Sequence, residues 1–216
     1  MSKTAEATGR GVFVTFEGID GCGKSTQAAF LCERLERDGK RVLRTFEPGD
    51  WEGGAPLRRL LLEGTPLSAR TELLLFLADR SGHWDAKIAP ALAEGRWVVC
   101  ERYTDSTLAY QSWGRGVPLG ELEGLLRWCR FPEPDLTFFL DIDEEEAAAR
   151  LRRRGGRDRI EAEGERDFMT RVARGYRELA KRNPGRIVAV GAGADAESVT
   201  GRIFGSLARR LREFPA

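Results

Sequence analysis

A phosphate-binding loop is the clearest chemical signal in the chain. The segment Gly18-Ile-Asp-Gly-Cys-Gly-Lys-Ser25 fits the pattern Gly-x4-Gly-Lys-Ser/Thr. Glycines allow backbone dihedrals that turn successive N–H groups toward phosphate oxygens. The lysine adds a mobile cation for the β- and γ-phosphates, and the serine offers a hydroxyl to Mg²⁺. The predicted ATP-binding residues are Gly18, Ile19, Asp20, Gly21, Cys22, Gly23, Lys24, Ser25 and Thr26.

The flanking sequence supplies the strand and the helix that such a loop requires. An apolar run at 12–16 precedes the loop, and a helical pattern at 23–38 follows it. The positive end of that helix would face the same anion. The alternative is a chance match, in which a Gly-rich turn carries an incidental lysine. The presence of both flanking elements favours the phosphate loop.

An acid and an arginine follow another apolar run, at 97–100. Glu101 would stand at the mouth of a buried strand, where a carboxylate can hold a Mg²⁺-bound water or orient a substrate. Arg102 has the planar fork that suits a phosphate. A structural ion pair that caps the strand is the alternative interpretation. Beside a phosphate loop the functional interpretation gains weight. We therefore expect Ser25 and Glu101 at a metal site, and Lys24, Glu101 and Arg102 among the catalytic residues.

A second group of arginines surrounds two adjacent glycines at 155–156. Such a segment suits a mobile lid, at about 150–163, that closes over polyphosphate and supplies charge to the transition state. Arg154 and Arg159 are the predicted catalytic residues there. A solvated helix end and an RNA contact are the alternatives. The nearly neutral chain, which lacks a second basic stripe, argues against RNA.

Strands and helices alternate along the chain. Short apolar runs that are rich in Val, Ile, Phe and Leu predict strands at 12–16, 41–46, 97–100, 136–140 and 186–190. Helical patterns cover 23–38, 55–62, 70–81, 83–94, 119–129, 144–153, 165–181 and 196–212, with Asp143 as a plausible N-cap. The prediction is an α/β fold: an open, doubly wound parallel sheet of about five strands flanked by helices. Ligands should bind beyond the carboxyl ends of the strands.

Length and composition indicate one compact domain. The chain has 216 residues, 41% of them hydrophobic, and a formal net charge of +1, which gives it no strong attraction to nucleic acid or anionic lipid. Its four cysteines are scattered, with no Cys-x-x-Cys pair and a single histidine, as suits a reducing, cytoplasmic compartment. No apolar stretch approaches the roughly 20 residues of a membrane helix. We expect a disordered tail at 1–10 and one domain at 11–216.

An ordered set of motifs makes the whole chain, from about residue 11 to the last helix, resemble the thymidylate kinases. The motifs are Phe16-Glu-Gly-Ile-Asp-Gly-Cys-Gly-Lys-Ser-Thr26, Glu47-Pro-Gly49, Leu75-Phe-Leu-Ala-Asp-Arg80, Glu101-Arg-Tyr103, Ser106-Thr-Leu-Ala-Tyr-Gln111, Gly114-Arg-Gly116, Pro134-Asp-Leu-Thr-Phe-Phe-Leu-Asp141 and Asp158-Arg-Ile-Glu161. The resemblance implies a P-loop nucleoside-monophosphate-kinase-like fold. It also implies transfer of the γ-phosphate of ATP to dTMP, with Mg²⁺, in a cytoplasmic homodimer that serves dTTP synthesis.

The resemblance also assigns residues to the acceptor. Phe76 would stack on the thymine, Arg80 and Arg102 would hold the monophosphate, and Tyr110 would lie against the deoxyribose. The full set that the resemblance implies for dTMP is Asp20, Glu47, Arg58, Phe76, Arg80, Arg102, Thr107, Tyr110 and Gln111.

Three positions depart from the pattern of the relatives. Glu101 stands where aspartate is usual, and Phe46 stands where a basic residue is common. Gly21 occupies a loop position at which some relatives carry a catalytic arginine, so the charge must come from elsewhere. The arginine-rich lid is the obvious source, as in the bacterial type of the family.

Two other functions stay open at this point. One is a kinase for another nucleoside or monophosphate, which a panel of acceptors would separate. The other is a nucleotide-hydrolysing switch that controls a partner. A GTPase switch should carry an Asn-Lys-x-Asp motif for the base, and this sequence has none.

Overall fold

A parallel five-stranded sheet forms the centre of the described part of the chain, which a computed structural model gives for residues 10–154 and 166–210. The strand order is β2-β3-β1-β4-β5, and every neighbouring pair is parallel. The strands are β1 (Phe13–Glu17), β2 (Val42–Phe46), β3 (Trp97–Glu101), β4 (Leu136–Asp141) and β5 (Ile187–Gly191). The predicted α/β fold is confirmed, and each strand lies within one residue of its predicted bounds.

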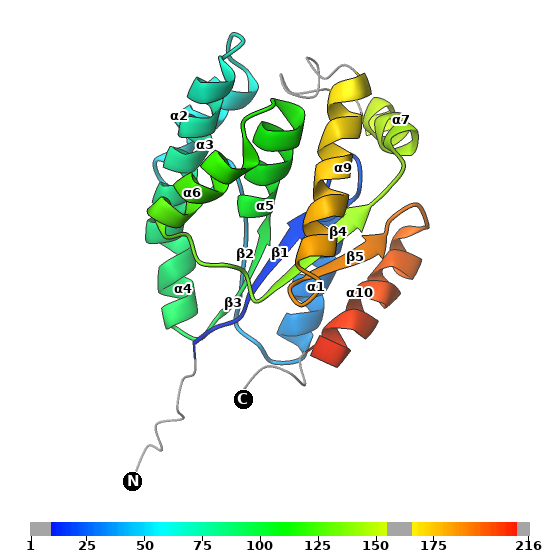
Figure 1. Ribbon diagram of the computed structural model, residues 1–216. Coiled ribbons are helices and arrows are strands. Elements are labelled where there is room, and N and C mark those ends of the chain that lie inside the picture. The colour runs from blue at the N-terminus through cyan, green and yellow to red at the C-terminus, as the bar shows by residue number, and fades with distance from the viewer. Residues whose placement is uncertain (1–9, 155–165, 211–216) are drawn as a thin grey trace.

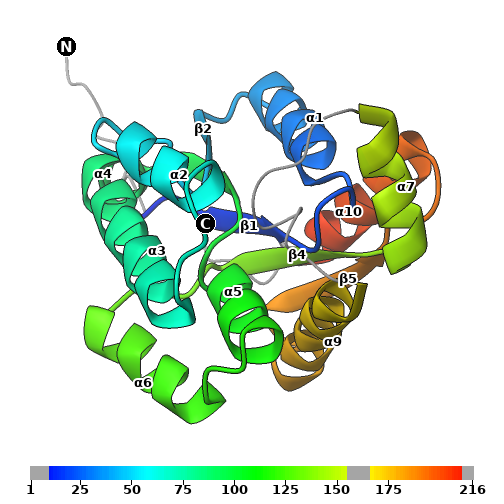
Figure 2. The ribbon, with the colours of Figure 1, turned by 90° about the horizontal axis from the view of Figure 1, so that it is seen from above.

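Helices cover both faces of the sheet (Figures 1 and 2). On one face lie α1 (Lys24–Arg37) and α10 (Ala196–Arg210); on the other lie α4 (Ala89–Ala93), α5 (Thr104–Thr107) and α9 (Arg166–Arg182). The remaining helices are α2 (Gly54–Leu62), α3 (Ala69–His83), α6 (Leu119–Cys129) and α7 (Glu144–Arg154). This double cover explains the nearly continuous apolar runs of the strands, because side chains on both faces are buried.

The central strand β1 is buried along its whole length. Phe13 packs with Val98 and Ile88 on the side of α4, whereas Val14 and Phe16 belong to the larger core that includes Leu31 of α1. A strand with its ends fixed between two cores gives the loop that follows it a rigid base.

The segment from 69 to 93 differs from its prediction. Instead of two helices at 70–81 and 83–94, α3 continues through a π-helical turn, η1 (Trp84–Ile88), directly into α4. Pro90 stands at the start of α4 and has no N–H for the helical ladder, which accounts for the change of register just before it. The continuous helical segment 69–93 therefore runs from the carboxyl-end side of the sheet to its opposite end (Figure 1).

The sequence patterns predicted no helix between β3 and α6, yet α5 and a π-helical segment, η2 (Leu108–Gly114), fill this stretch. The helix forms against α9, with glycines at the contact. A Cβ on Gly114 would lie 2.7 Å from the Phe168 ring, and one on Gly175 would lie 2.9 Å from Trp113. Tertiary packing rather than local propensity thus makes this segment helical.

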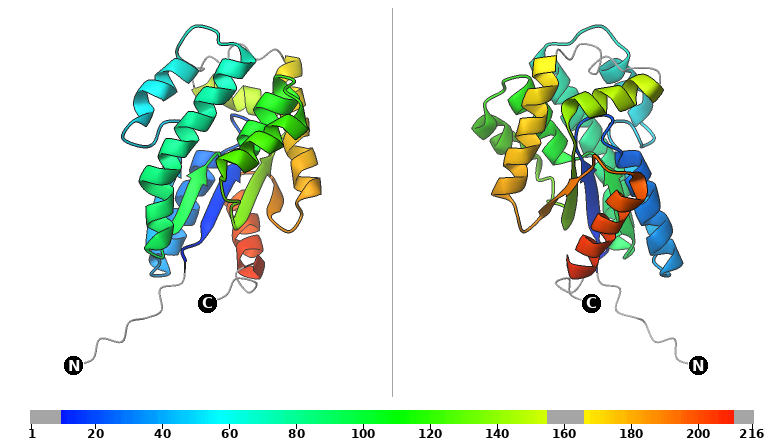
Figure 3. Two further views of the ribbon diagram at one scale, coloured as in Figure 1. Left: turned by 60° about the vertical axis from the view of Figure 1, so that its left-hand side comes forward. Right: turned by 90° about the vertical axis from the view of Figure 1, so that its right-hand side faces the viewer.

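The carboxyl ends of the strands meet at one end of the molecule, where α2 and α7 also lie (Figure 3). Asp143 caps α7 as predicted: its Oδ1 accepts hydrogen bonds from the N–H groups of Glu145 and Glu146, at 2.9 and 3.2 Å. The loops that follow the strands therefore lie together at this end of the sheet, as expected for an open parallel sheet.

A buried ion pair connects the sheet to α5. Arg186, just before β5, donates to both carboxylate oxygens of Asp105 at 2.6 and 2.9 Å, and to the hydroxyl of Thr137 on β4 at 2.9 Å. The side chains of Arg186 and Asp105 are 14% and 2% exposed. Removal of one partner would leave the other as an uncompensated charge.

Replacement of this arginine should therefore destabilise the fold strongly. Arg186→Met should lower the free energy of unfolding by about 3–5 kcal/mol, because Asp105 stays buried without its cation. Urea denaturation measures the loss. Lys181→Met is the matched control, since Lys181 forms a solvent-exposed pair with Glu178, and should cost under about 1 kcal/mol. Equal losses for the two variants would contradict this account.

Candidate active site

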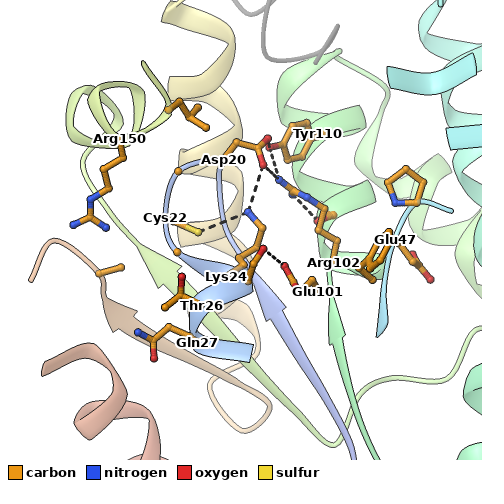
Figure 4. Close-up of a pocket in the computed structure, with 18 of the residues that line it drawn as sticks. Asp20, Cys22, Lys24, Thr26, Gln27, Glu47, Glu101, Arg102, Tyr110 and Arg150 are labelled. Carbon is orange, nitrogen blue, oxygen red and sulfur yellow. Dashed lines mark hydrogen bonds and ion pairs between the residues drawn. The ribbon is translucent and has the colours of Figure 1, made fainter. Parts of the chain in front are cut away.

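A cavity of about 860 Å³ opens at the carboxyl ends of β1, β2 and β3 (Figure 4). Lining residues come from the glycine-rich loop, the strand ends, α2, α3, α5, η2, α7 and the segment after β5. The predicted site residues among them are Asp20, Gly21, Cys22, Gly23, Lys24, Ser25, Thr26, Glu47, Arg58, Phe76, Arg80, Glu101, Arg102, Thr107, Tyr110 and Gln111. The structure thus brings nearly the whole predicted set into one space.

The glycine-rich loop wraps around its own lysine. The Lys24 ammonium donates to the carbonyl oxygens of Gly18 and Ile19, both at 3.0 Å, and lies 3.6 Å from Asp20 Oδ1. These contacts place Gly18 and Ile19 behind the lysine. The cation is therefore held at the centre of the loop, directly before the N-terminus of α1, where an anion is favoured.

Gly21 is the point at which α7 touches this loop. Its φ is +84°, and a Cβ there would lie 2.4 Å from the carbonyl oxygen of Ala147. A side chain of any size at this position would push α7 away. The arginine that some relatives carry here is thus replaced by direct helix–loop contact.

Ser25 and Glu101, the two predicted metal residues, meet across the mouth of the loop. The Ser25 hydroxyl donates to Glu101 Oε2 at 2.5 Å, and Arg44 on β2 donates to Glu101 Oε1 at 3.0 Å and to the Ser25 carbonyl oxygen at 2.9 Å. Two hard oxygen ligands side by side fit Mg²⁺. The described residues contain no cluster of three His, Cys, Asp or Glu that could hold a metal alone. Phosphate oxygens of a nucleotide would have to complete the coordination.

Arg102 lies beside the loop in a left-handed backbone conformation, with φ +68°. Its Nη2 donates to Asp20 Oδ1 at 2.5 Å, and its Nη1 faces the Gly18 carbonyl oxygen at 3.3 Å. The guanidinium carbon lies 5.1 Å from the centre of the Tyr110 ring. Burial alone would lower the pKa of Arg102, but Asp20 raises it well above its usual value. The side chain is therefore a permanent cation beside the loop.

Asp20 is shared by the two cations of the site. Burial alone would raise its pKa, but Arg102 and then Lys24 outweigh burial and lower the pKa below its usual value. The Tyr110 hydroxyl also donates to Asp20 Oδ2, at 3.2 Å. Asp20 is therefore ionised at neutral pH and fixes the distance between the loop lysine and Arg102.

A second arginine, Arg80 on α3, lies deeper and is 2% exposed. It donates to Glu47 Oε2 at 2.8 Å, to the Thr107 hydroxyl at 2.7 Å and to the Tyr103 carbonyl oxygen at 2.9 Å. Burial would lower the pKa of Arg80, but Glu47 raises it. Phe76 precedes Arg80 by one helical turn, so the two share a face of α3. Arg80 thus belongs to the same wall as the predicted base-stacking ring.

The remaining predicted substrate residues lie near this wall. Arg58 lies over the Phe46 ring, 5.2 Å from its centre, and donates to the Pro48 carbonyl oxygen at 2.7 Å. The aromatic ring at position 46 therefore supports this arginine. Gln111 donates to Glu72 Oε1 at 3.2 Å, a contact that fixes its amide at the edge of the cavity.

Sequence reasoning missed a fully buried acid at the end of β1. Glu17 accepts hydrogen bonds from the Tyr103 N–H at 2.7 Å, the Ser106 hydroxyl at 2.6 Å and the Tyr176 hydroxyl at 3.1 Å. Burial, and then the charge of Asp105, raise the pKa of Glu17 to about 7. Its only sequence signal is a charged residue that ends an apolar strand.

The far side of the cavity was also missed. Gln27, Arg44, and residues 192, 194–196 and 199 after β5 line it. Arg150 on α7, which the sequence places at the start of the predicted lid, lines the same side. Arg150 points into the cavity (Figure 4) and pairs with Glu146 at 2.6 Å. Of the predicted lid at about 150–163, the Arg154 side chain and all of 155–163, with Arg159, lie outside the described residues. The lid stays a prediction.

The arrangement suits transfer of a phosphoryl group between two bound phosphates. Lys24 and the start of α1 form one anion site, and Arg102 and Arg58 line the wall opposite. Transfer of this kind needs alignment and charge stabilisation more than a protein nucleophile.

The sequence is similar to known proteins over most of its length. The family model for thymidylate kinase matches residues 16–203. A thymidylate kinase of Synechococcus sp. (strain JA-3-3Ab) is 45% identical over 201 residues, which cover 93% of this chain and 97% of that relative. One of Gluconobacter oxydans (strain 621H) is 46% identical over 202 residues, which cover 91% and 94%. The crystal structure of thymidylate kinase from Ehrlichia chaffeensis superposes with a TM-score of 0.76 at 32% identity, covering 93% of this chain and 99% of that one.

Proposed function

The chain belongs to the thymidylate kinase family and phosphorylates dTMP to dTDP using ATP, and we propose that the cavity at the carboxyl ends of β1, β2 and β3 is where this transfer takes place. The observation that carries the proposal is Asp20. It contacts Lys24 of the phosphate loop and Arg102 of the opposite wall. One carboxylate therefore sets the relative position of a donor-phosphate cation and an acceptor-phosphate cation.

ATP binds with its phosphates in the glycine-rich loop in this proposal. Backbone N–H groups between Gly18 and Thr26 surround the β-phosphate, and Lys24 neutralises the β- and γ-phosphates. The adenosine then extends toward the far side of the cavity. Gln27 and the segment after β5 form that side, and Arg150 closes it from α7.

Mg²⁺ would be held by the Ser25 hydroxyl and, directly or through water, by Glu101. When bound, the ion supplies charge compensation to the phosphate oxygens. Arg44 keeps Glu101 turned toward Ser25, because it donates to both residues. The longer side chain of glutamate still reaches the hydroxyl at 2.5 Å, so the exchange for aspartate is compatible with this role.

The acceptor binds on the opposite wall. The resemblance implies that Arg80 and Arg102 both bind the monophosphate, and we propose that they have different roles. Arg102 holds the phosphate with help from Arg58, since it lies against the loop. Arg80 lies on the same face of α3 as Phe76 and directs its remaining N–H groups at the edge of the base. Thr107 and Gln111 face the same edge. Glu47 orients Arg80 through their ion pair. Tyr110 forms the wall against the deoxyribose.

Catalysis then consists of alignment and charge stabilisation. The transferred group passes through a loose transition state whose charge is spread over its oxygens. Lys24 holds the donor phosphate and Arg102 holds the acceptor phosphate, so that the two are in line. The lid arginines, Arg154 and Arg159 among them, would add positive charge and exclude water. Hydrolysis of ATP in place of transfer would be suppressed by that exclusion.

The chain acts as one kinase domain at 11–216 in this proposal, in the cytoplasm as its scattered cysteines suggest. Within the described helices, none combines the length and the apolar character needed to span a bilayer. A homodimer is proposed as well. Leu74 of α3 and Trp128 of α6 are 53% and 80% exposed, and these two helices pack against each other through Leu73, Leu77 and Leu122. Exposed apolar side chains on paired helices suit self-association.

Loss of the loop lysine should abolish turnover without unfolding the chain. Lys24→Ala should reduce dTMP-dependent ADP release by at least about 10²–10³-fold, since an electrostatic contact to the transferred group is removed. Circular dichroism should stay unchanged, and exposed Lys40→Ala is the control. A folded variant with near-normal activity would refute the assignment of the loop.

Tyr110 should decide the choice of sugar. A 2′-hydroxyl against the ring is crowded and desolvated, so Tyr110→Ala should narrow the preference for dTMP over ribothymidine monophosphate by about tenfold, while weakening dTMP use. Tyr110→Phe should keep the preference, because the ring remains. The measurement is kcat/KM for both acceptors. Full deoxyribose preference in Tyr110→Ala would assign the sugar wall to other residues.

The dimer should depend on the face of α3 and α6. Leu74→Glu should convert the chain to monomers in sedimentation velocity, because it buries a charge in the contact. Ala208→Glu, at an exposed position of α10 on the opposite side of the sheet, should leave the dimer intact. A monomeric unsubstituted chain would refute the proposal.

A further inference from the structure

A hydrogen-bond cluster lies against Nη1 of Arg102, and the proposed mechanism does not use it. Glu17 Oε2 accepts from the hydroxyls of Ser106 and Tyr176 at 2.6 and 3.1 Å. The two hydroxyl oxygens lie 2.8 Å apart. Both also face Arg102 Nη1, at 3.1 and 3.3 Å. The arginine is thus held at Nη1 by two hydroxyls that share one acid.

The directions of these hydrogen bonds follow from counting hydrogens. Each hydroxyl has one hydrogen, and an ionised carboxylate only accepts. Arg102 only donates. With Glu17 ionised, both hydroxyl hydrogens can lie on the carboxylate or between the hydroxyls, so both oxygens accept from Arg102. With a proton on Glu17 Oε2, the three hydroxyl groups can close a ring in which each donates to the next, so Ser106 and Tyr176 still accept from Arg102. An amide NH2 at this place donates two hydrogens and accepts none, which leaves one hydroxyl hydrogen to turn toward the guanidinium.

We propose that Glu17 is a positioning residue for dTMP: by accepting from Ser106 and Tyr176 it turns both hydroxyls into acceptors for Arg102 and so fixes the arginine that holds the acceptor phosphate. The inference rests on the proposed role of Arg102. It extends that role to three residues that touch neither substrate in the proposed arrangement.

The backbone next to Arg102 supports the same conclusion. Glu17 Oε1 accepts from the Tyr103 N–H at 2.7 Å, and the Arg102 N–H donates to the Phe16 carbonyl oxygen at 2.9 Å. These bonds hold the left-handed turn at Arg102, which is unfavourable for a residue with a Cβ. They also orient any amide placed at position 17: its oxygen must face Tyr103 N–H, so its NH2 must face the hydroxyls.

The charge on Glu17 changes in a useful pH range. The charged and titratable groups around it are Asp105, Arg102 and Tyr103 after β3, Cys100 on β3, Tyr176 on α9, Arg80 on α3 and Arg186 before β5. Burial, and then Asp105, raise its pKa to about 7. Below this pH Glu17 takes up a proton, which the ring of three hydroxyl groups accommodates. The orientation of both hydroxyls toward Arg102 should therefore persist as the pH falls through 7.

Glu17→Gln keeps the volume and reverses the hydrogen-bond direction. Above pH 7 it should lower kcat/KM for dTMP by about 10- to 100-fold, the effect of lost hydrogen bonds to a charged group, and leave the KM for ATP within about twofold. The ratio of kcat/KM for the unsubstituted enzyme to kcat/KM for Glu17→Gln should stay well above one below pH 7 as well, because a protonated carboxyl still accepts a hydrogen bond and an amide NH2 does not. Ionisation of the dTMP phosphate is common to both enzymes and cancels in this ratio. An unchanged kcat/KM, or a ratio that falls to one below pH 7, would overturn the proposal.

A mutant cycle separates orientation of hydroxyls from direct attraction between charges. In a Ser106→Ala/Tyr176→Phe background Glu17 has no hydroxyl to orient, so Glu17→Gln should change kcat/KM for dTMP by less than about threefold. A full effect in that background would show that the charge of Glu17 acts on Arg102 directly, against the proposal. Arg102→Met is measured alongside. If Arg102→Met keeps its kcat/KM for dTMP, the proposed function of Arg102 fails. If Arg102→Met loses kcat/KM for dTMP and Glu17→Gln does not, only the proposed role of Glu17 fails.

Thermal stability distinguishes positioning from a structural role. The pKa of Glu17 is raised in the fold, so between about pH 4.5 and 7 the folded chain holds a proton that the unfolded chain releases, and stability falls as the pH rises. The Tm of Glu17→Gln relative to the unsubstituted chain should therefore rise from pH 5 to 8. The opposite trend would mean that the charge serves the fold. If Glu17→Gln does not fold, Tyr176→Phe must show a severalfold loss of kcat/KM for dTMP with the KM for ATP within about twofold, and an unchanged kcat/KM for dTMP would overturn the proposal.

Discussion

The site depends on one guanidinium, which is held between a carboxylate and a pair of hydroxyl groups. Arg102 meets Asp20 through Nη2 and the hydroxyls of Ser106 and Tyr176 through Nη1. Asp20 is in turn shared with Lys24. A shift of Arg102 would therefore disturb the phosphate loop, and a shift of the loop would disturb Arg102. Donor and acceptor phosphates are positioned by one connected set of charges, which is what an in-line transfer requires.

The departures from the relatives become intelligible once neighbouring side chains are included. Glu101 reaches the Ser25 hydroxyl and is held from its other oxygen by Arg44. Phe46 stands where a basic residue is common, and its ring lies under the guanidinium of Arg58. The cation at this place is therefore Arg58, which packs on the Phe46 ring. Each of these two exchanges thus has an arginine as its partner in space: Arg44 contacts Glu101, and Arg58 lies over Phe46.

Much of the fold was accessible from sequence because its signals are local. The glycine-rich loop, the five apolar strands and the acid and arginine after β3 each occupy a few consecutive residues. The helical segment at 104–114 was not predicted, because its helicity comes from contact with Phe168 and other residues of α9. The role of Glu17 was hidden for a related reason: its partners Tyr103, Ser106 and Tyr176 lie 86, 89 and 159 residues away. Such contacts exist only after the chain has folded.

The contact between Gly21 and α7 couples the phosphate loop to the position of that helix. A Cβ at position 21 would lie 2.4 Å from the Ala147 carbonyl oxygen, so an arginine in the loop and a helix packed at this distance exclude each other. A variant with arginine at position 21 would therefore need a compensating change in α7, and the loop and the helix can be redesigned only together.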